Sequence, residues 1–325
     1  MTAPARRRKV VVFGSLNMDL VARVPRMPAP GETLAGRSFL ANPGGKGANQ
    51  AVACARQGAH VELVGRVGDD GFAATLRAAL AAQAVDAGGV ATVSGAATGT
   101  AMIFVDDAAQ NCIAVIAGAN AHVSCDDARA LRPRLHEAAL LLLQLEVPVD
   151  AVLHAAAVAR ASGCRVLLNP APARPLPEAL WPLLDILVLN ESEACLLTGM
   201  PQVTRDTAVQ AAATLRSRGP RDVLVTLGAE GVVWAGEAGA QHFDALRVQA
   251  LDTTAAGDTF IGALAALLVE GHAMPEAVRH AIRAAALCVT RVGAQASMPT
   301  RAEVEAFDVS ASGTHGAPAA PGGPN

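Results

Sequence analysis

The sequence lacks three features that mark other classes of protein: closely spaced cysteine pairs, long apolar segments and a strong excess of one charge. Its six cysteines lie at positions 54, 112, 125, 164, 195 and 288, and none of them forms a CxxC pair. Scattered cysteines of this kind are typical of small buried residues in a reducing compartment. We therefore expect neither a disulfide framework nor a zinc site.

The absence of long apolar segments and of a charge excess narrows the possible partners. No run of about 18 uncharged apolar residues is present, so no membrane span is expected. The basic run Arg6–Lys9 is followed by a short apolar segment, Val10–Phe13, that ends at a glycine. This pattern does not match a signal peptide, and we expect a cytoplasmic protein. The chain has 26 basic and 29 acidic residues, which favours neither nucleic acid nor an anionic membrane as a partner.

The sequence does contain enough apolar material for a large core, with 52% hydrophobic residues in 325. Short apolar segments alternate with helical segments, which predicts a mainly parallel sheet covered by helices on both faces. Strands are expected at 10–14, 61–67, 140–145, 166–169, 186–190, 223–227 and 231–235, and a hairpin at 100–105 and 112–116. Helices are expected at 48–57, 70–83 and 149–162 and from 191. The Pro- and Gly-rich segment 23–39 predicts strands and turns of a small subdomain.

Polar residues follow several of these expected strands. Asn17, Glu146, Asn190 and Thr226–Gly228 lie at or just after strand ends. Ligands of open α/β sheets bind beyond the carboxyl ends of the strands. These residues are therefore candidates for a binding site.

The heptapeptide Asp252–Asp258, DTTAAGD, leads into an apolar stretch, 259–269, that is typical of a helix. Its small residues allow backbone N–H groups to gather around an anion at the positive N-terminal end of that helix. Asp258 falls in the first turn, where a carboxylate can act as a base. Taken alone, the motif also fits an ordinary capped helix after a small-residue turn.

A second motif, Asn42–Gln50, has three glycines around Lys46, then two amide side chains and an Ala-rich helical segment. Glycine permits close backbone approach to a ligand. Lys46 and Asn49 add donors suited to hydroxyl groups. The presence of both motifs in this order argues against a plain solvated loop.

Together the two motifs resemble the signature segments of the PfkB-type carbohydrate kinases. Ala255–Ala256 stand where many members have Gly-Ala. Further segments resemble the ribokinase branch of that family, over roughly residues 9 to 307. They are GSLNMD at 14–19, PGET at 30–33, GGKGANQA at 44–51, QLE at 144–146, NPAPA at 169–173, NESE at 190–193, TLG at 226–228 and RVGAQAS at 291–297.

The resemblance implies a ribokinase-like three-layer α/β/α fold with a mainly parallel central sheet and a small β-sheet lid. It implies one kinase domain over 9–308, with the lid formed from about 16–42 and 99–117, and a homodimer joined through the lid. The segment 1–8 and the Gly-, Pro- and Ala-rich segment 312–325 are expected to be disordered.

The chemistry of a small polyol requires carboxylates and amides that bind hydroxyl groups. The resemblance aligns such a set with sugar contacts: Asn17, Asp19, Lys46, Asn49, Glu146 and Asp258, with backbone groups of Gly45 and Gly47. It assigns ATP to Asn190, Thr226, Leu227, Gly228, Ala229, Glu230, Gly231, Gly257, Asp258 and Ile282. Ile282 stands where His or Asn is common, so the preferred nucleotide stays open.

Two metal ions are implied by the same resemblance. Magnesium would lie near Asn190 and Glu193, partly through water, although an N-cap with an acidic first turn explains Asn190 equally well. Potassium would be held by Asp252, Thr254, Cys288, Arg291, Gly293 and Ser297. Cys288 and Arg291 would contribute their main-chain oxygens.

The implied reaction is in-line transfer of the γ-phosphoryl group of Mg-ATP to the 5-hydroxyl of D-ribose. Asp258 would accept the hydroxyl proton, and the backbone N–H groups of Ala255, Ala256 and Gly257 would form an anion hole. A related kinase acting on deoxyribose, a different sugar or a nucleoside remains an alternative. A non-catalytic sugar- or nucleotide-binding regulator is a second alternative, against which Asp258 and Gly257 argue.

Overall fold

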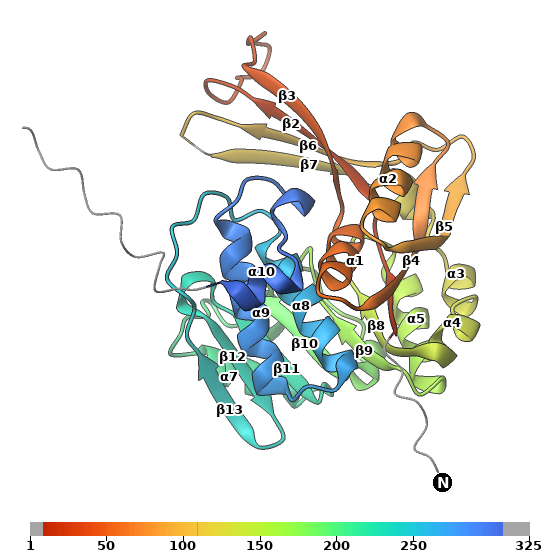
Figure 1. The fold of residues 1–325 in the computed structure, drawn as a ribbon, viewed down its shortest axis with the longest axis vertical. Helices are drawn as coiled ribbons and strands as arrows, with labels where there is room; N and C mark the ends of the chain where they lie inside the picture. The colour runs from red at the N-terminus through yellow and green to blue at the C-terminus, as the bar shows by residue number, and fades with distance from the viewer. Residues whose placement is uncertain (1–8, 109, 308–325) are drawn as a thin grey trace, which may run out of the picture.

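The computed structural model describes residues 9–108 and 110–307 and contains a nine-stranded central sheet (Figure 1). Its strand order is β13-β12-β11-β10-β9-β8-β1-β4-β5. Neighbouring strands from β11 to β5 are parallel, and β12 and β13 add an antiparallel edge. The strands are β1 (Lys9–Phe13), β4 (His60–Gly68), β5 (Asp86–Val93), β8 (Ala138–Leu143), β9 (Arg165–Leu168), β10 (Ile186–Asn190), β11 (Asp222–Thr226), β12 (Val232–Gly236) and β13 (Gly239–Phe243).

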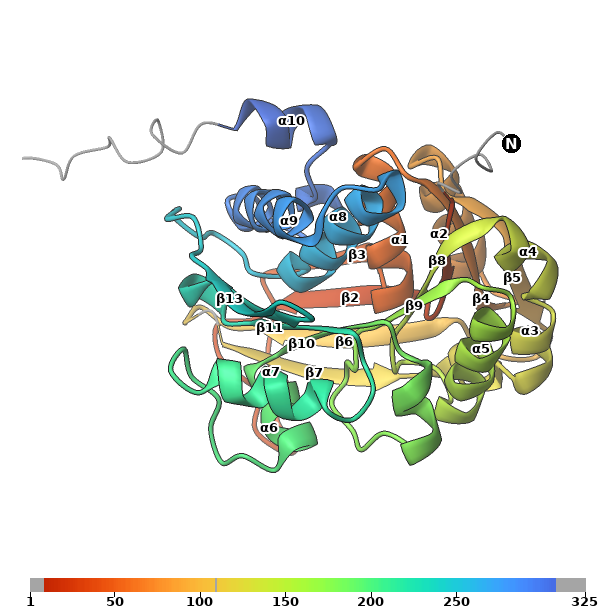
Figure 2. The same cartoon turned by 90° about the horizontal axis from the view of Figure 1, so that it is seen from below.

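Helices cover both faces of this sheet (Figure 2). One face carries α1 (Lys46–Arg56), α2 (Gly71–Ala82), α8 (Ala256–Glu270), α9 (Met274–Val289) and α10 (Arg301–Ala306). The other carries α3 (Cys125–Arg129), α4 (Arg132–Glu137), α5 (Val149–Ala161), α6 (Glu191–Thr198) and α7 (Ala208–Arg216). Short 3-10 turns occur at Gly118–His122, Glu178–Leu183, Gly228–Glu230 and Gln295–Ser297.

The apolar runs of the central strands follow from this double coverage, because both faces of each strand are buried. In β1, Val10 and Val12 pack into the core under α1 and α8, whereas Val11 and Phe13 pack into the core on the other face. No helix of the described residues is long and apolar enough to cross a lipid bilayer.

A second, four-stranded sheet rises from one edge of the molecule above α1 and α8 (Figure 1). Its order is β3-β2-β6-β7, with β2 (Asn17–Arg23), β3 (Ser38–Gly44), β6 (Gly99–Val105) and β7 (Asn111–Ile116). β3 leads through Gly45 directly into α1. The small sheet is therefore continuous with the motif Asn42–Gln50, called the glycine-lysine motif below. The expected ribokinase-like three-layer α/β/α fold with a small second sheet is confirmed.

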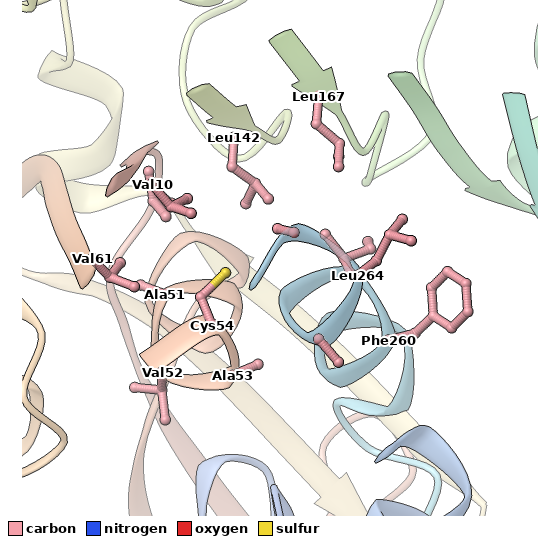
Figure 3. Packing of buried hydrophobic residues seen from close by; sticks show 14 of the residues in the cluster. Val10, Ala51, Val52, Ala53, Cys54, Val61, Leu142, Leu167, Phe260 and Leu264 are labelled. Atoms are coloured by element: carbon pink, nitrogen blue, oxygen red, sulfur yellow. The ribbon is translucent and has the colours of Figure 1, made fainter. Parts of the chain in front are cut away.

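The helices α1 and α8 pack side by side, and this contact places the two sequence motifs together. Figure 3 shows Ala53 and Cys54 of α1 and Leu264 of α8 in one core cluster with Leu142 of the sheet. Gly262 makes the close approach possible, since a Cβ at this position would lie 2.7 Å from the backbone nitrogen of Cys54.

Some element boundaries differ from the expectations. The helix expected from 259 begins at Ala256, because the small residues of the motif already form its first turn. The strand expected to reach 145 ends at Leu143. The segment between β2 and β3, residues 24–37, is turn and irregular chain. β5, α7 and β13 were not predicted. The expected disorder of 1–8 and 312–325 concerns segments outside the described residues.

Candidate active site

A cavity lies beyond the carboxyl ends of β9, β10 and β11 and is closed on one side by the start of α8. Its lining includes Lys46 from the glycine-lysine motif, Asn169 after β9, Asn190 and Glu193 around the start of α6, and Thr226 at the end of β11. The turn Ala255–Asp258 supplies the opposite wall. The structure therefore brings both sequence motifs to one cavity at the sheet edge where ligands of α/β folds bind.

Asp258 lies in the first turn of α8 and is 8% exposed. Its Oδ2 accepts a hydrogen bond from Asn49 Nδ2 at 3.1 Å, and its Oδ1 accepts one from Gln50 Nε2 at 2.9 Å. Two bonds of this kind, one to each oxygen, fix the orientation of the carboxylate. A buried, oriented carboxylate at a helix N-terminus can serve as a proton acceptor beside a bound anion.

Glu146 is the centre of a second polar cluster, three residues beyond β8. Its Oε2 accepts hydrogen bonds from Ser15 Oγ at 2.6 Å and from the backbone N–H of Lys46 at 3.0 Å. Asn17 Nδ2 lies 3.5 Å from the same oxygen. Asn17 is held in place by the buried Asn120, whose Nδ2 donates to Asn17 Oδ1 at 2.7 Å. The carboxylate thus joins the loop after β1 to the glycine-lysine motif.

Asp19 projects from β2 next to Gly44, where a Cβ would lie 2.1 Å from Asp19 Oδ2. Burial, together with the negative charges of Glu146 and Asp258, raises the pKa of Asp19 to about 7. Lys46 is half-buried among these acids, and the charge of Asp258, with smaller contributions from Glu146 and Glu193, raises its pKa although burial opposes this. The charges of Asp258, Glu146 and Glu193 therefore act on one ammonium group, and such a set of charged groups is suited to binding hydroxyl groups.

Asn190 and Glu193 form a capping box at the start of α6. Asn190 Oδ1 accepts from the backbone N–H of Glu193 at 2.9 Å, and Glu193 Oε2 accepts from the backbone N–H of Asn190 at 3.0 Å. Glu193 is 6% exposed, and burial raises its pKa. Both side chains line the cavity, so the helix-cap role anticipated for Asn190 and a place beside a ligand occur together.

The other residues expected near the nucleotide lie in two places. Thr226 lines the cavity, and Gly228, Ala229 and Glu230 form an exposed 3-10 turn next to it, with Gly231 in a left-handed conformation at φ 96°. Ile282 is 8% exposed on α9 and belongs to the core cluster under the sheet. It does not line the cavity in the described structure.

The segments expected to hold potassium meet beside the start of α8. Asp252 Oδ1 accepts from the backbone N–H of Thr254 at 2.9 Å, and its Oδ2 accepts from that of Gly293 at 2.9 Å. Burial opposes ionisation of Asp252, but these hydrogen bonds outweigh it and hold its pKa below the usual value. Cys288 Sγ lies 3.1 Å from Ser297 Oγ and 3.9 Å from the Thr254 carbonyl oxygen. The Arg291 side chain pairs instead with Glu303 at 2.7 Å.

The turn before α8 contains a residue in an unusual conformation. Ala255, the N-cap of α8, has φ 60° and ψ 12°, in the left-handed region that alanine rarely adopts. It stands at one of the positions where the sequence departs from the common Gly-Ala pair. The following Ala256 and Gly257 continue into the helix. The N–H group of Ala256 donates to the Thr253 carbonyl oxygen at 3.3 Å, and that of Gly257 belongs to the first helical turn, whose N–H groups have no intrahelical acceptor.

Sequence reasoning missed the amide side chains that support the site. Gln50, Gln144, Asn169 and Gln295 are all buried, and each takes part in a hydrogen-bond chain that ends at Asp258. Asn120 supports Asn17 in the same way. Four of these residues lie in the sequence motifs described above, but the sequence alone does not show which amide group contacts which partner.

Comparisons with known proteins agree with this geometry. The family model described as pfkB family carbohydrate kinase matches residues 7–301. A ribokinase of Haemophilus influenzae is 42% identical over 93% of this chain and 98% of its own length. A deoxyribokinase of Salmonella typhi is 39% identical over 90% of this chain and 95% of its own length. The solved structure of an Arabidopsis thaliana ribokinase complexed with ribose and ATP has a TM-score of 0.85, with 34% identity over 92% of this chain and 98% of that one.

The family model spans most of the chain, and the two signature motifs that define the cavity lie within it. The protein therefore belongs to the pfkB family of carbohydrate kinases.

Proposed function

We propose that the protein transfers the γ-phosphoryl group of ATP to O5 of D-ribose, giving D-ribose 5-phosphate and ADP. The observation that carries the proposal is the buried carboxylate of Asp258 at the start of α8, held by Asn49 and Gln50 of the glycine-lysine motif. Relatives named ribokinase, and the related structure that contains ribose and ATP, support this choice of substrates.

In this mechanism Asp258 accepts the proton of the attacking hydroxyl group. The backbone N–H groups of Ala255, Ala256 and Gly257 stabilise the charge that develops on the transferred phosphoryl group. Phosphoryl transfer needs positioning and electrostatic stabilisation more than covalent chemistry, and both are available at this helix N-terminus. The small four-stranded sheet acts as a lid that excludes water from the reacting groups.

The sugar is bound by the acids and amides on the lid side of Asp258. Asn17, Asp19, Asn49 and Glu146, with Lys46 and the backbone of Gly45 and Gly47, present acceptors and donors from three segments that the fold brings together. Glu146 is already tied to the backbone of Lys46, so the sugar meets a preorganised set of groups.

ATP and magnesium occupy the cavity on the other side of Asp258, with the nucleotide extending over the turn 226–231. Asn190 and Glu193 fit a sparse magnesium site, because carboxylate and amide oxygens suit Mg²⁺ and this ion keeps much of its water. Bound there, magnesium neutralises charge on the phosphates. Potassium fits the loop around Asp252, where a carboxylate, a serine hydroxyl and main-chain oxygens meet.

Deoxyribose is the second candidate substrate, because a deoxyribokinase matches this chain almost as well as the ribokinases do. Loss of one hydroxyl group leaves most of the proposed sugar contacts unchanged. A protein that carries the full set of polar sugar contacts is expected to prefer the substrate with more hydroxyl groups.

We also propose an oligomeric state and a cellular location for the protein. The small sheet exposes several large apolar side chains: Phe39, Leu40, Met102, Ile113, Val115 and Ile116. Exposed apolar surface of this extent favours a protein contact, and we propose a homodimer joined through this sheet. None of the six cysteines, all within the described residues, forms a disulfide, and this fits a cytoplasmic location.

A coupled assay of ADP release over a panel of pentoses, hexoses and nucleosides tests the substrate. Ribose is expected to give the highest kcat/KM. Asp258→Asn should reduce turnover at least ~100-fold while sugar binding remains, since a proton acceptor is removed without loss of volume. Near-normal turnover of this variant would remove Asp258 from the mechanism.

A further inference from the structure

Gln50 occupies a position in the site that the proposed reaction does not explain. It is the fifth residue of α1, and its side chain is fully buried. Its Nε2 donates to Asp258 Oδ1 at 2.9 Å and to Asn169 Oδ1 at 3.1 Å. Its Oε1 accepts from Gln144 Nε2 at 2.6 Å. One amide group therefore joins the ends of β8 and β9 to the carboxylate at the start of α8.

The orientation of this amide is set by the backbone of the central sheet. Asn169 Nδ2 donates to the Val188 carbonyl oxygen of β10 at 3.0 Å, so Asn169 Oδ1 points toward Gln50. If the Gln50 amide were reversed, its oxygen would face two acceptor oxygens, those of Asn169 and Asp258. The chain of bonds thus forces the N–H groups of Gln50 toward the carboxylate.

This orientation leaves one buried acceptor of the network without a hydrogen bond. Gln144 donates to Gln50, and its own Oε1 is buried without a hydrogen-bond partner in the described part of the chain. Buried acceptors without partners are uncommon in folded proteins and call for an explanation. Gly14 leaves room for this oxygen, since a Cβ there would lie 2.1 Å from it. The reverse chain would not remove this cost, because it would place Gln144 Nε2 in the unpartnered position and would also turn an acceptor of Gln50 toward Asp258.

We propose that Gln50 is a positioning residue for phosphoryl transfer, which holds the carboxylate of Asp258 in the one orientation that can take the substrate proton. Asn49 holds the second oxygen of the carboxylate from the same helix. Two bonds to adjacent residues of α1 prevent rotation of the Asp258 side chain. A fixed acceptor matters because small displacements of a reacting group reduce rates severely. This inference rests on the proposed function of Asp258.

The test is a double-mutant cycle between Gln50→Met and Asp258→Asn. Methionine keeps the length of the side chain and removes both N–H donors. With the sugar that the wild-type protein phosphorylates fastest, Gln50→Met should lower kcat about 10- to 100-fold and change the sugar KM by less than about 3-fold. In the Asp258→Asn background the same change should alter kcat by less than about 2-fold, because Gln50 acts through Asp258.

Two further variants separate positioning from general damage. Gln57→Met removes a buried glutamine at the other end of α1, which bonds the Pro299 carbonyl oxygen and His280. It should lower stability and leave kcat unchanged. Gln50→Leu also removes both N–H donors without adding a charge beside Asp258, so it tests the same donor loss if Gln50→Met does not fold, and it should also lower kcat.

Wild-type kcat in folded Gln50→Met or Gln50→Leu protein would overturn the proposal. So would a loss of the same size in the Asp258→Asn background, which would mean that Gln50 acts independently. A wild-type preference for a sugar other than ribose would overturn the substrate assignment and not the role of Gln50, because the cycle uses whichever sugar is turned over.

Discussion

Gly262 of α8 lies so close to Ala53 of α1 that a Cβ added to the glycine would sit 2.3 Å from the Ala53 Cβ. Each residue lies one helical turn beyond a residue of the site, since Ala53 follows Asn49 and Gly262 follows Asp258 by four positions. The close contact therefore sets the distance between the two helix starts. A small residue at 262 is a requirement of the site geometry as well as of the core.

The first prediction follows from this contact. Gly262→Ala should lower the free energy of unfolding by about 1–3 kcal/mol, because the added methyl group meets backbone and cannot be accommodated by a side-chain rotation. It should also reduce kcat, since the helix starts are pushed apart. Urea unfolding and steady-state kinetics provide the measurements. Gly71→Ala is the matched control: nothing lies within 4 Å of a Cβ at that helical position. It should change stability by less than about 0.5 kcal/mol.

The fold could be predicted from the sequence where burial leaves a clear pattern. β8 is apolar throughout and β10 is apolar as far as Leu189, because both faces of these strands are covered by helices. The edge strands β5 and β13 were not predicted. β5 contains two adjacent glycines, and β13, with the sequence GAQHF, has no apolar run. Partly exposed edge strands do not need one. Tertiary pairing, and not local pattern, makes them strands.

The sequence motifs indicated the main residues of the candidate site, but not the buried amide side chains that hold them in place. Asp258 belongs to a segment whose composition indicates an anion site, and Lys46 to one whose donors suit hydroxyl groups. Gln295 reaches Asn49 across 246 positions, and Asn120 reaches Asn17 across 103. Contacts at such separations depend on how the loops fold over the sheet, which composition and spacing do not specify.

The second prediction concerns the strained N-cap of α8. Ala255→Gly should raise the free energy of unfolding by about 1 kcal/mol, because glycine adopts the left-handed conformation without the Cβ penalty. Turnover should stay within about 3-fold of the wild-type value, since the backbone path is kept. Ala256→Gly, one residue later and in the helix proper, should give no such gain in thermal unfolding. Equal effects of the two substitutions would contradict the strain at Ala255.

The third prediction uses the raised pKa of Asp19, about 7 in the folded protein against an ordinary value of 3.8. The folded state then binds a proton more tightly than the unfolded state, so the stability contribution of Asp19 is lost as the pH rises from about 4 to about 7. Asp19→Asn removes this dependence. Relative to the wild type, the variant should gain on the order of 1–4 kcal/mol between pH 4 and pH 8. Urea unfolding of both proteins at several pH values measures the gain, and parallel stability curves would contradict it.

The fourth prediction concerns Glu146, which accepts hydrogen bonds from Ser15 and from the backbone of Lys46. Glu146→Ala should weaken sugar binding by roughly 1–3 kcal/mol, because a partner hydroxyl group and the Lys46 N–H lose their acceptor. Calorimetric titration with ribose measures this. Glu137→Ala, an exposed glutamate at the end of α4, serves as the control and should leave affinity unchanged. If ribose affinity is kept while that for another sugar falls, the ribose assignment is wrong.

The last prediction concerns the cation. Asp252 bonds the backbone N–H groups of Thr254 and Gly293, so it joins the loop before α8 to the loop after α9. A potassium ion held between these loops would stiffen the anion-hole turn without contacting phosphate. Activity should rise when sodium is replaced by potassium at constant ionic strength, because the larger ion suits a ring of main-chain oxygens. Asp252→Ala should remove most of this response and lower activity even in saturating potassium, since it takes away the anionic ligand and the bond between the loops. Asp244→Ala, at an exposed aspartate paired with Arg205 on the surface, should keep the full potassium response. Equal rates in sodium and potassium for the wild type, with no loss of activity in Asp252→Ala, would show that the loop has a structural role alone.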